Sequence, residues 1–85
     1  MITNMNGYLL IQNAFRVALG GPDEMVYEGA QYGVTAGWDS MAHMQLIAEI
    51  EAAFDIMLNT DEVISLSSFE RAQEILKTHG IDVCA

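Results

Sequence analysis

Apolar residues recur three or four positions apart in several stretches of this chain, and that spacing limits what it can fold into. Such spacing places apolar side chains on one face of an α-helix, whereas a half-buried strand needs an alternation that the chain nowhere sustains. Pro22 is the one proline, so the strongest helix breaker is otherwise absent. We therefore expect an all-α fold: a small four-helix bundle, with three longer helices, one short helix and a long loop between the first two helices.

The first expected helix spans residues 4–19 and ends at Gly20-Gly21-Pro22, because glycine suits a left-handed cap and proline cannot continue a helix. Its apolar stripe consists of Tyr8, Ile11, Phe15 and Ala18. The connection that follows, residues 20–39, has no clean period, and connections of that length are often functional. We expect its apolar groups, at positions 25–27 and 32–34, to pack onto the helices.

The second expected helix is the clearest, and it begins at Asp39 or Ser40 and runs to Phe54. Its inner stripe is expected to comprise Met44, Ile47, Ile50 or Glu51, and Phe54, with Leu46 and Ala53 widening it. Trp38 precedes this helix, and we expect its large ring to pack inside the loop, with cofactor recognition as the alternative role.

The remaining helices are indicated by capping patterns. The run Asn59-Thr60-Asp61-Glu62 predicts a short helix that ends near Ser65. The last helix is expected to start at Ser67, because Ser67 and Glu70 have the spacing of a capping box, and to stop at Gly80. Its inner stripe comprises Phe69, Ala72, Ile75 and Leu76.

Length and charge set the class of protein. We expect 85 residues to form a single domain, residues 1–85, and a hydrophobic content of 52% is enough to build one core. The formal net charge of −9 repels phosphate backbones and anionic lipid headgroups. We therefore expect no nucleic-acid or membrane partner, and instead partner proteins with basic surfaces.

The cysteine content and the first residues of the chain are used to predict the cellular compartment. Cys84 is the one cysteine, which excludes an internal disulfide and a cysteine-based metal cluster. The start lacks the positively charged region of a signal peptide, and no apolar run reaches the length of a membrane helix. We expect a cytoplasmic monomer.

Motifs for catalysis are missing from the chain. It has no Gly-x-Ser-x-Gly elbow, no phosphate-binding P-loop and no His-Glu-x-x-His, and His43 and His79 are too far apart to suggest a metal pair. Ser40 and His43 would share one helix face, but a hydrolase also needs an orienting acid and an oxyanion hole. We expect a protein that is not an enzyme, with a serine hydrolase as a weak alternative.

Ser40 stands out by its position at the start of the clearest helix. Serine is among the preferred helix N-caps, so a purely structural role would explain it. A helix N-terminus also accommodates phosphate, because its backbone N–H groups and the positive end of the helix dipole face the anion. The hydroxyl of Ser40 is therefore also a good attachment point for a phosphodiester.

The segment around Ser40 resembles the core of an acyl carrier protein. The family pattern is Asp-Ser-Leu or Asp-Ser-Met followed by an aliphatic stripe, here Gly37-Trp38-Asp39-Ser40-Met41 with Met44, Leu46, Ile47, Ile50 and Phe54. Further matches are Phe54-Asp55-Ile56, Leu58, Leu66-Ser67-Ser68-Phe69, Ala72, Ile75 and Leu76. The resemblance is strong over residues 37–77 and looser over residues 1–36.

This resemblance implies a function and its residues. A phosphopantetheinyl transferase would attach 4'-phosphopantetheine from coenzyme A to Ser40, and the arm would hold acyl or aminoacyl intermediates as thioesters. Asp39 would cap the helix or present Ser40 to the transferase and its Mg²⁺. Met41 would be a docking contact or pack in the core.

The acidic residues along and after the second helix form either a solvated face or a docking surface for basic patches on loading and biosynthetic enzymes. They are Glu49, Glu51 and Asp55, with Asp61 and Glu62. In having Trp38 and neutral residues after Ser40, the segment resembles carriers of polyketide, nonribosomal or other specialised pathways more than carriers of bulk fatty-acid synthesis.

The alternative function is that of an acidic helical adaptor, which binds a partner protein and carries no modification.

Overall fold

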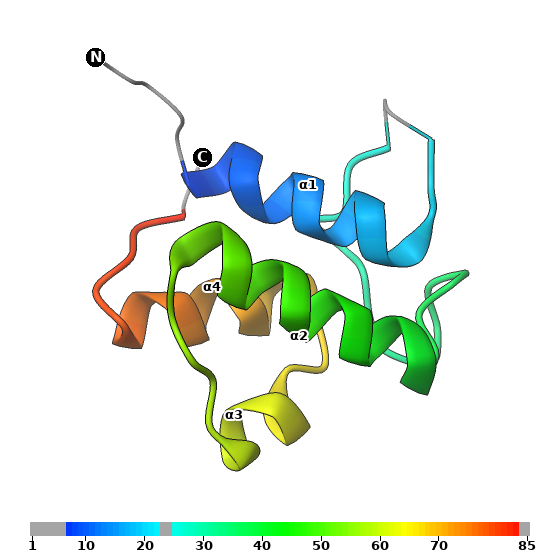
Figure 1. Cartoon of the computed structure of the whole chain (residues 1–85). Coiled ribbons are helices and arrows are strands. Elements are labelled where there is room, and N and C mark those ends of the chain that lie inside the picture. Colours follow the sequence, from blue (N-terminus) through cyan, green and yellow to red (C-terminus); the bar gives the residue numbers. More distant parts are fainter. Residues whose placement is uncertain (1–6, 23–24, 84–85) are drawn as a thin grey trace.

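The computed structural model describes residues 7–22 and 25–83, which form a four-helix bundle (Figure 1). The helices are α1 (Gly7–Leu19), α2 (Ser40–Phe54), α3 (Thr60–Ser65) and α4 (Phe69–Thr78). Within these residues there is no β-strand, only an isolated bridge between Gln31 and Ser68, and no helix is long and apolar enough to cross a bilayer. The all-α prediction, with one short helix and a long first connection, is confirmed.

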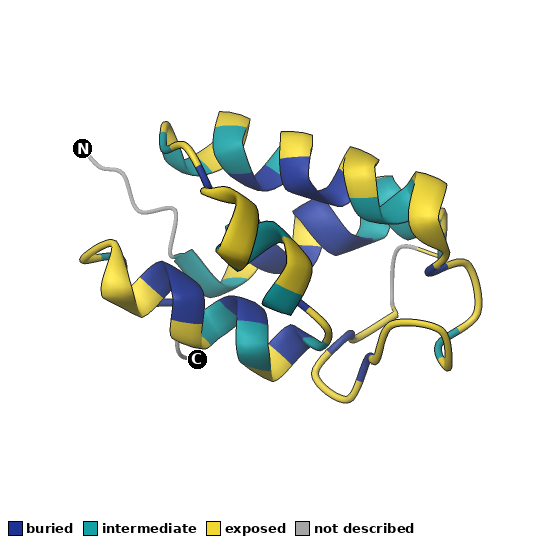
Figure 2. Ribbon diagram, turned by 90° about the horizontal axis from the view of Figure 1, so that it is seen from below, coloured by how far each residue is buried: buried dark blue, intermediate teal, exposed yellow. Residues whose placement is uncertain are grey.

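The helices are arranged in layers. α1 packs on α2, which runs in the opposite direction, and α4 lies beside α2 (Figure 1). α3 lies on the side of the bundle away from α1, where it crosses the space between α2 and α4 (Figures 1 and 2). The inward faces of α1, α2 and α4 carry the buried residues, whereas α3 presents exposed and half-buried residues (Figure 2).

The core is centred on Phe15, which is fully buried. Its ring centroid lies 4.9 Å from that of Phe69, 5.1 Å from that of Trp38 and 5.9 Å from that of Tyr27. These rings come from α1, α4 and the connection, so one aromatic cluster joins three parts of the chain. The burial of Trp38 confirms its predicted packing role.

The connection between α1 and α2 only partly follows the prediction that its apolar groups pack onto the helices. Tyr27, Ala30 and Trp38 are buried, whereas four other large apolar groups of the connection are exposed: Met25, Val26, Tyr32 and Val34. Hydrogen bonds also hold this segment to the helices. Tyr27 N–H donates to Gln12 Oε1 at 3.0 Å, and Phe69 N–H donates to Ala30 O at 3.0 Å.

Helix boundaries agree with the predictions except at the start of α4. Asn59 caps α3, as expected, and it also forms a capping box with Glu62. The capping box predicted for Ser67 and Glu70 is wrong, because Ser68 is the N-cap and its hydroxyl accepts from Arg71 N–H at 2.9 Å. Ser67 is held outside the helix, since its carbonyl accepts from Tyr32 N–H at 2.9 Å.

The inner face of α2 starts one residue earlier than its predicted stripe. Leu46, Ile47 and Ile50 are buried and Phe54 packs against the core, as expected. Met44 is 60% exposed and Ala53 is exposed, so both were wrongly placed in the stripe. The positions of α2 that face inward are 43, 46, 47, 50 and 54. The first of these positions is occupied by His43. The α1 and α4 stripes are buried or partly buried as predicted, and positions 4–6 of the first expected helix lie outside the described residues.

Candidate functional site

Ser40 is the first residue of α2, and it is exposed. The N-cap is Asp39, whose Oδ1 accepts from Ala42 N–H at 2.9 Å, so the capping role considered for Ser40 is wrong and that for Asp39 is confirmed. Within the described residues the Ser40 hydroxyl has no side-chain hydrogen bond. Ser40 therefore carries an exposed hydroxyl group that does not cap the helix.

The chain before Ser40 is held in place by Trp38 and Gly37. The Trp38 backbone exchanges hydrogen bonds within the connection, donating to Thr35 O at 3.1 Å and accepting from Gly33 N–H at 3.2 Å. Gly37 has a φ of +87°, and a Cβ there would lie 2.7 Å from Leu19 O. Only glycine fits this approach to the end of α1 without strain. These anchors place Asp39 and Ser40 at a defined corner of the bundle.

Met41 follows Ser40 and is 83% exposed, so the prediction that it packs in the core is wrong. Met44, one turn along the helix, is also exposed. Methionine is a flexible apolar residue suited to adaptable contacts. Met41 and Met44 therefore offer exposed apolar side chains near Ser40. No Lys or Arg occurs in the sequence between Arg16 and Arg71.

The acidic residues of α2 divide into those that hold the fold and those that do not. Glu51 accepts from Leu58 N–H at 2.9 Å, which fastens the segment after the helix. Asp55 is the C-cap in the left-handed conformation, with a φ of 54°. Among the residues that the structure describes, Glu49 accepts only from the exposed Gln45 side chain, at 2.7 Å. Of the predicted docking acids, Glu49 has the least structural use.

Glu62 also has a structural role. Its carboxylate accepts from Asn59 N–H at 3.0 Å and lies 2.9 Å from His79 Nε2. The Asn59 N–H holds the pKa of Glu62 below its ordinary value; burial opposes this shift and the His79 hydrogen bond adds to it. Asp61 remains exposed. Glu62 thus joins α3 to the end of α4.

His43 has a structural role that its position in the sequence did not predict. Trp38 Nε1–H donates to His43 Nδ1 at 3.1 Å, and His43 Nε2 lies 2.8 Å from Val63 O. Both ring nitrogens are therefore engaged away from Ser40, and the considered Ser-His pair is not formed. Positions 43, 46, 47 and 50 have the spacing of one helix face, and this pattern in the sequence indicates that His43 faces inward with the buried residues.

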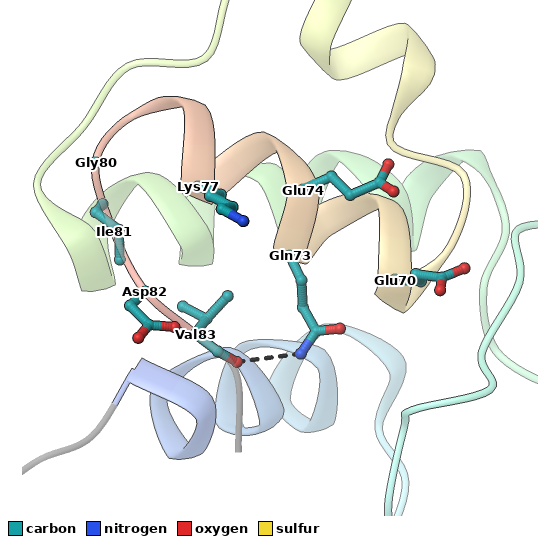
Figure 3. A pocket seen from close by; sticks show the side chains of 8 residues that line it. All are labelled: Glu70, Gln73, Glu74, Lys77, Gly80, Ile81, Asp82 and Val83. Atoms are coloured by element: carbon teal, nitrogen blue, oxygen red, sulfur yellow. Dashed lines mark hydrogen bonds between the residues drawn. The ribbon is translucent and has the colours of Figure 1, made fainter.

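Other candidate sites are few in the part of the chain that the structure describes. No three potential metal ligands gather there. A surface hollow lies between the outer face of α4 and residues 80–83, where Gln73 Nε2 donates to Val83 O at 3.1 Å (Figure 3). Its lining mixes acids with Lys77, and Ser40 is not part of it.

Comparison with protein-family models, with curated proteins and with solved structures finds no match to this chain.

Proposed function

We propose that this chain is an acyl carrier protein of a specialised pathway, with 4'-phosphopantetheine attached to Ser40. The observation that carries the proposal is the exposed Ser40 hydroxyl at the first residue of α2, free of the capping role that Asp39 performs. The resemblance of residues 37–77 to the family supports it, as does the four-helix fold. A carrier needs an accessible serine and does not need a catalytic base beside it. Both ring nitrogens of His43 have partners other than Ser40, which suits a carrier better than a serine hydrolase.

The residues around Ser40 fit such a group. Asp39 already accepts from the Ala42 N–H, but the positive end of the α2 dipole still favours a phosphate on the adjacent hydroxyl. The exposed Met41 leaves room for a long substituent and offers it an apolar contact. The arm would supply a thiol for carrying acyl or aminoacyl groups, since a thiolate is nucleophilic near neutral pH.

Intact mass after co-expression with a promiscuous phosphopantetheinyl transferase tests the proposal. We expect the parent to gain the mass of one arm and Ser40→Ala to gain none. Ser67→Ala is the matched control, because Ser67 is also exposed and is not an N-cap. Ser40→Ala should keep its fold, since Asp39 still caps α2.

Two outcomes would contradict the proposal: a parent that gains no mass, or a Ser40→Ala variant that is still modified. A parent protein that stays unmodified would favour the alternative function, an acidic adaptor that binds a partner protein. The exposed apolar side chains of this chain would also suit such binding. The five most exposed of these side chains outside α1 and residues 25–32 are Val34, Met41, Met44, Met57 and Ile64.

Asp39 has a second proposed role, presenting Ser40 to the transferase and its Mg²⁺. Asn is as good an N-cap as Asp, so Asp39→Asn removes the charge and leaves the helix capped. We expect Asp39→Asn to slow modification while the melting temperature stays near that of the parent. Equal modification rates would leave capping as the sole role of Asp39.

Met41 and Glu49 are the proposed docking contacts that the fold does not otherwise need. Rim charges tune association rate and salt dependence, whereas an apolar anchor tunes dissociation. With the transferase as the partner, Glu49→Lys should slow modification at low salt, and added salt should shrink the difference. Met41→Ala should slow it with little salt dependence.

Glu70→Lys is the control for this comparison, since it makes the same charge change at an exposed position of α4. If Glu49→Lys and Glu70→Lys behave alike, net charge rather than docking at α2 explains the effect. Glu51 and Asp55 are left unchanged in these variants, because they hold the end of α2.

A further inference from the structure

His43 is the side chain through which the connection, α2 and α3 meet. It lies one turn after Ser40 on α2, and it is half-buried. Trp38 Nε1–H donates to His43 Nδ1 at 3.1 Å, and His43 Nε2 lies 2.8 Å from Val63 O. One side chain of α2 therefore links the segment that leads into Ser40 with α3.

The two partners of His43 require one tautomer of its ring. The Trp38 indole N–H can only donate, so Nδ1 is the acceptor. The Val63 carbonyl can only accept, so Nε2 carries the proton and donates it. Val63 is among the last four residues of α3, whose carbonyls have no partner within their own helix. An apolar side chain at position 43 would take this partner away from both groups.

Trp38 is held to α2 by its side chain. The residue is 2% exposed, and its ring packs edge-on against Phe15 with the ring centroids 5.1 Å apart. The backbone hydrogen bonds of Trp38 return to the connection, whereas its indole N–H reaches His43 on α2. Because a buried N–H group without a partner is costly, the position of this indole depends on an acceptor at residue 43.

Two hydrogen bonds thus join the residues just before Ser40 to the start of α2. Asp39 Oδ1 accepts from Ala42 N–H at 2.9 Å, and Trp38 donates to His43. Asp39 alone separates Trp38 from Ser40 in the sequence. The path by which the chain arrives at Ser40 is therefore set by both bonds.

We infer that His43 is a positioning residue for the modification of Ser40. Both ring nitrogens have other partners, so it acts on Ser40 through Trp38, by holding the segment before Ser40 and α3 in one arrangement that the transferase recognises. This inference rests on the proposed attachment of phosphopantetheine to Ser40. When only a fraction of the molecules has the arrangement that a partner binds, the apparent affinity falls in proportion to that fraction. Loss of the bridge therefore raises the KM of the transferase for this chain and leaves kcat nearly unchanged.

Modification kinetics with a promiscuous phosphopantetheinyl transferase and coenzyme A test the inference, with this chain as the varied substrate and intact mass as the readout. His43→Leu has neither a donor nor an acceptor. We expect it to raise KM by roughly 2- to 10-fold, the range that one net hydrogen bond supplies. His43→Gln has one acceptor and one donor, so it should bring KM back toward that of the parent.

An NMR measurement follows the bridge itself. Trp38 is the one tryptophan of the chain, so its indole N–H gives a single resonance. We expect this proton to exchange with water faster in His43→Leu than in the parent, and more slowly again in His43→Gln. The amide protons of α1 are the internal reference, because a general loss of stability would speed their exchange as well.

His79→Leu is the matched control. His79 also contacts α3, at 2.9 Å from the Glu62 carboxylate, but it reaches α3 from the end of α4 and not through Trp38. His79→Leu should therefore keep the KM and the indole exchange of the parent. Trp38→Phe is a second variant that breaks the bridge from its other side, since it keeps a ring and removes the donor. We expect Trp38→Phe to raise KM as His43→Leu does, and its KM decides the matter if His43→Leu does not fold.

The inference would be overturned if His43→Leu and Trp38→Phe are modified with the KM of the parent. An equal rise of KM in His79→Leu would also overturn it, because loosening of α3 would then explain both variants. A parent that gains no arm overturns the proposed function and this inference with it. A parent that is modified equally well with and without His43 overturns this inference alone.

Discussion

Tyr27 has a buried hydroxyl that finds no hydrogen-bond partner within the described residues. The ring is 2% exposed and packs against Phe15. A Cβ added at Gly21 would lie 2.1 Å from the hydroxyl oxygen, so Gly21 is required where the chain passes this group. Tyr27 thus stabilises the core through its ring and not through its polar atom.

Removing that hydroxyl should not harm the protein. A buried polar atom without a partner costs about 1–3 kcal/mol, so we expect Tyr27→Phe to leave the free energy of unfolding unchanged or to raise it. Urea denaturation measures the change. Tyr8→Phe is the contrasting variant, because the Tyr8 hydroxyl donates to Glu28 and accepts from Gln12. A Tyr27→Phe variant that is less stable than Tyr8→Phe would refute this account.

At the scale of single helices, the phase of α2 decides which residues matter for stability. Ile50 is fully buried, and we expect Ile50→Ala to cost about 2–5 kcal/mol. Phe54 is only partly buried against the core, so Phe54→Ala should cost less than the roughly 3–5 kcal/mol of a fully buried phenylalanine. Met44→Ala should stay within about 0.5 kcal/mol of the parent, because its side chain is exposed.

Denaturant unfolding of these three variants gives the ranking. If Met44→Ala were as destabilising as Ile50→Ala, the inner face of α2 would be centred elsewhere than on Leu46, Ile47 and Ile50.

The attachment of α3 through Glu62 should depend on pH. The folded state lowers the pKa of Glu62, chiefly through the Asn59 N–H, so its charged form favours folding. That contribution is present above the ordinary glutamate pKa and is lost as pH falls through the folded-state value. Glu62→Gln keeps the capping-box spacing without the charge. We expect the parent to be more stable than Glu62→Gln near neutral pH, and the difference to vanish in acid.

Thermal melts of both proteins as a function of pH measure this difference. Asp61→Asn is the control, since Asp61 is the exposed neighbour in the same helix. If the difference in melting temperature between the parent and Glu62→Gln stays the same in acid, then Glu62 stabilises the fold through its shape and not through its charge.

For the whole molecule, the net charge of −9 is the dominant electrostatic property. Only three basic side chains, Arg16, Arg71 and Lys77, oppose twelve carboxylates, so the folded state bears a repulsion that the expanded chain relieves. Salt screens exposed charges over a Debye length of about 8–10 Å at physiological strength. We therefore expect moderate salt to raise the melting temperature at pH 7. A melting temperature that is constant from low to physiological salt would show that this repulsion is negligible.

Local patterns in the sequence were sufficient to predict the helices and most of the core. The stripes of α1 and α4 follow from helical spacing, and the bounds of α3 follow from its capping residues, because both depend on residues within one or two turns. The same reasoning placed Ser40 at the start of α2. Its carrier function stays a prediction that the mass measurement decides.

Only the tertiary structure decided which polar groups are partners outside the helix caps. Glu51 meets Leu58 N–H, Ser67 O meets Tyr32 N–H, and His43 joins Trp38 to Val63. The last two contacts span long stretches of chain, and each needs the path of a loop as well as the phase of a helix. Spacing along a sequence specifies which side chains share a helix face. It does not specify which backbone N–H or carbonyl a loop will bring to that face, because that depends on how all the helices pack together.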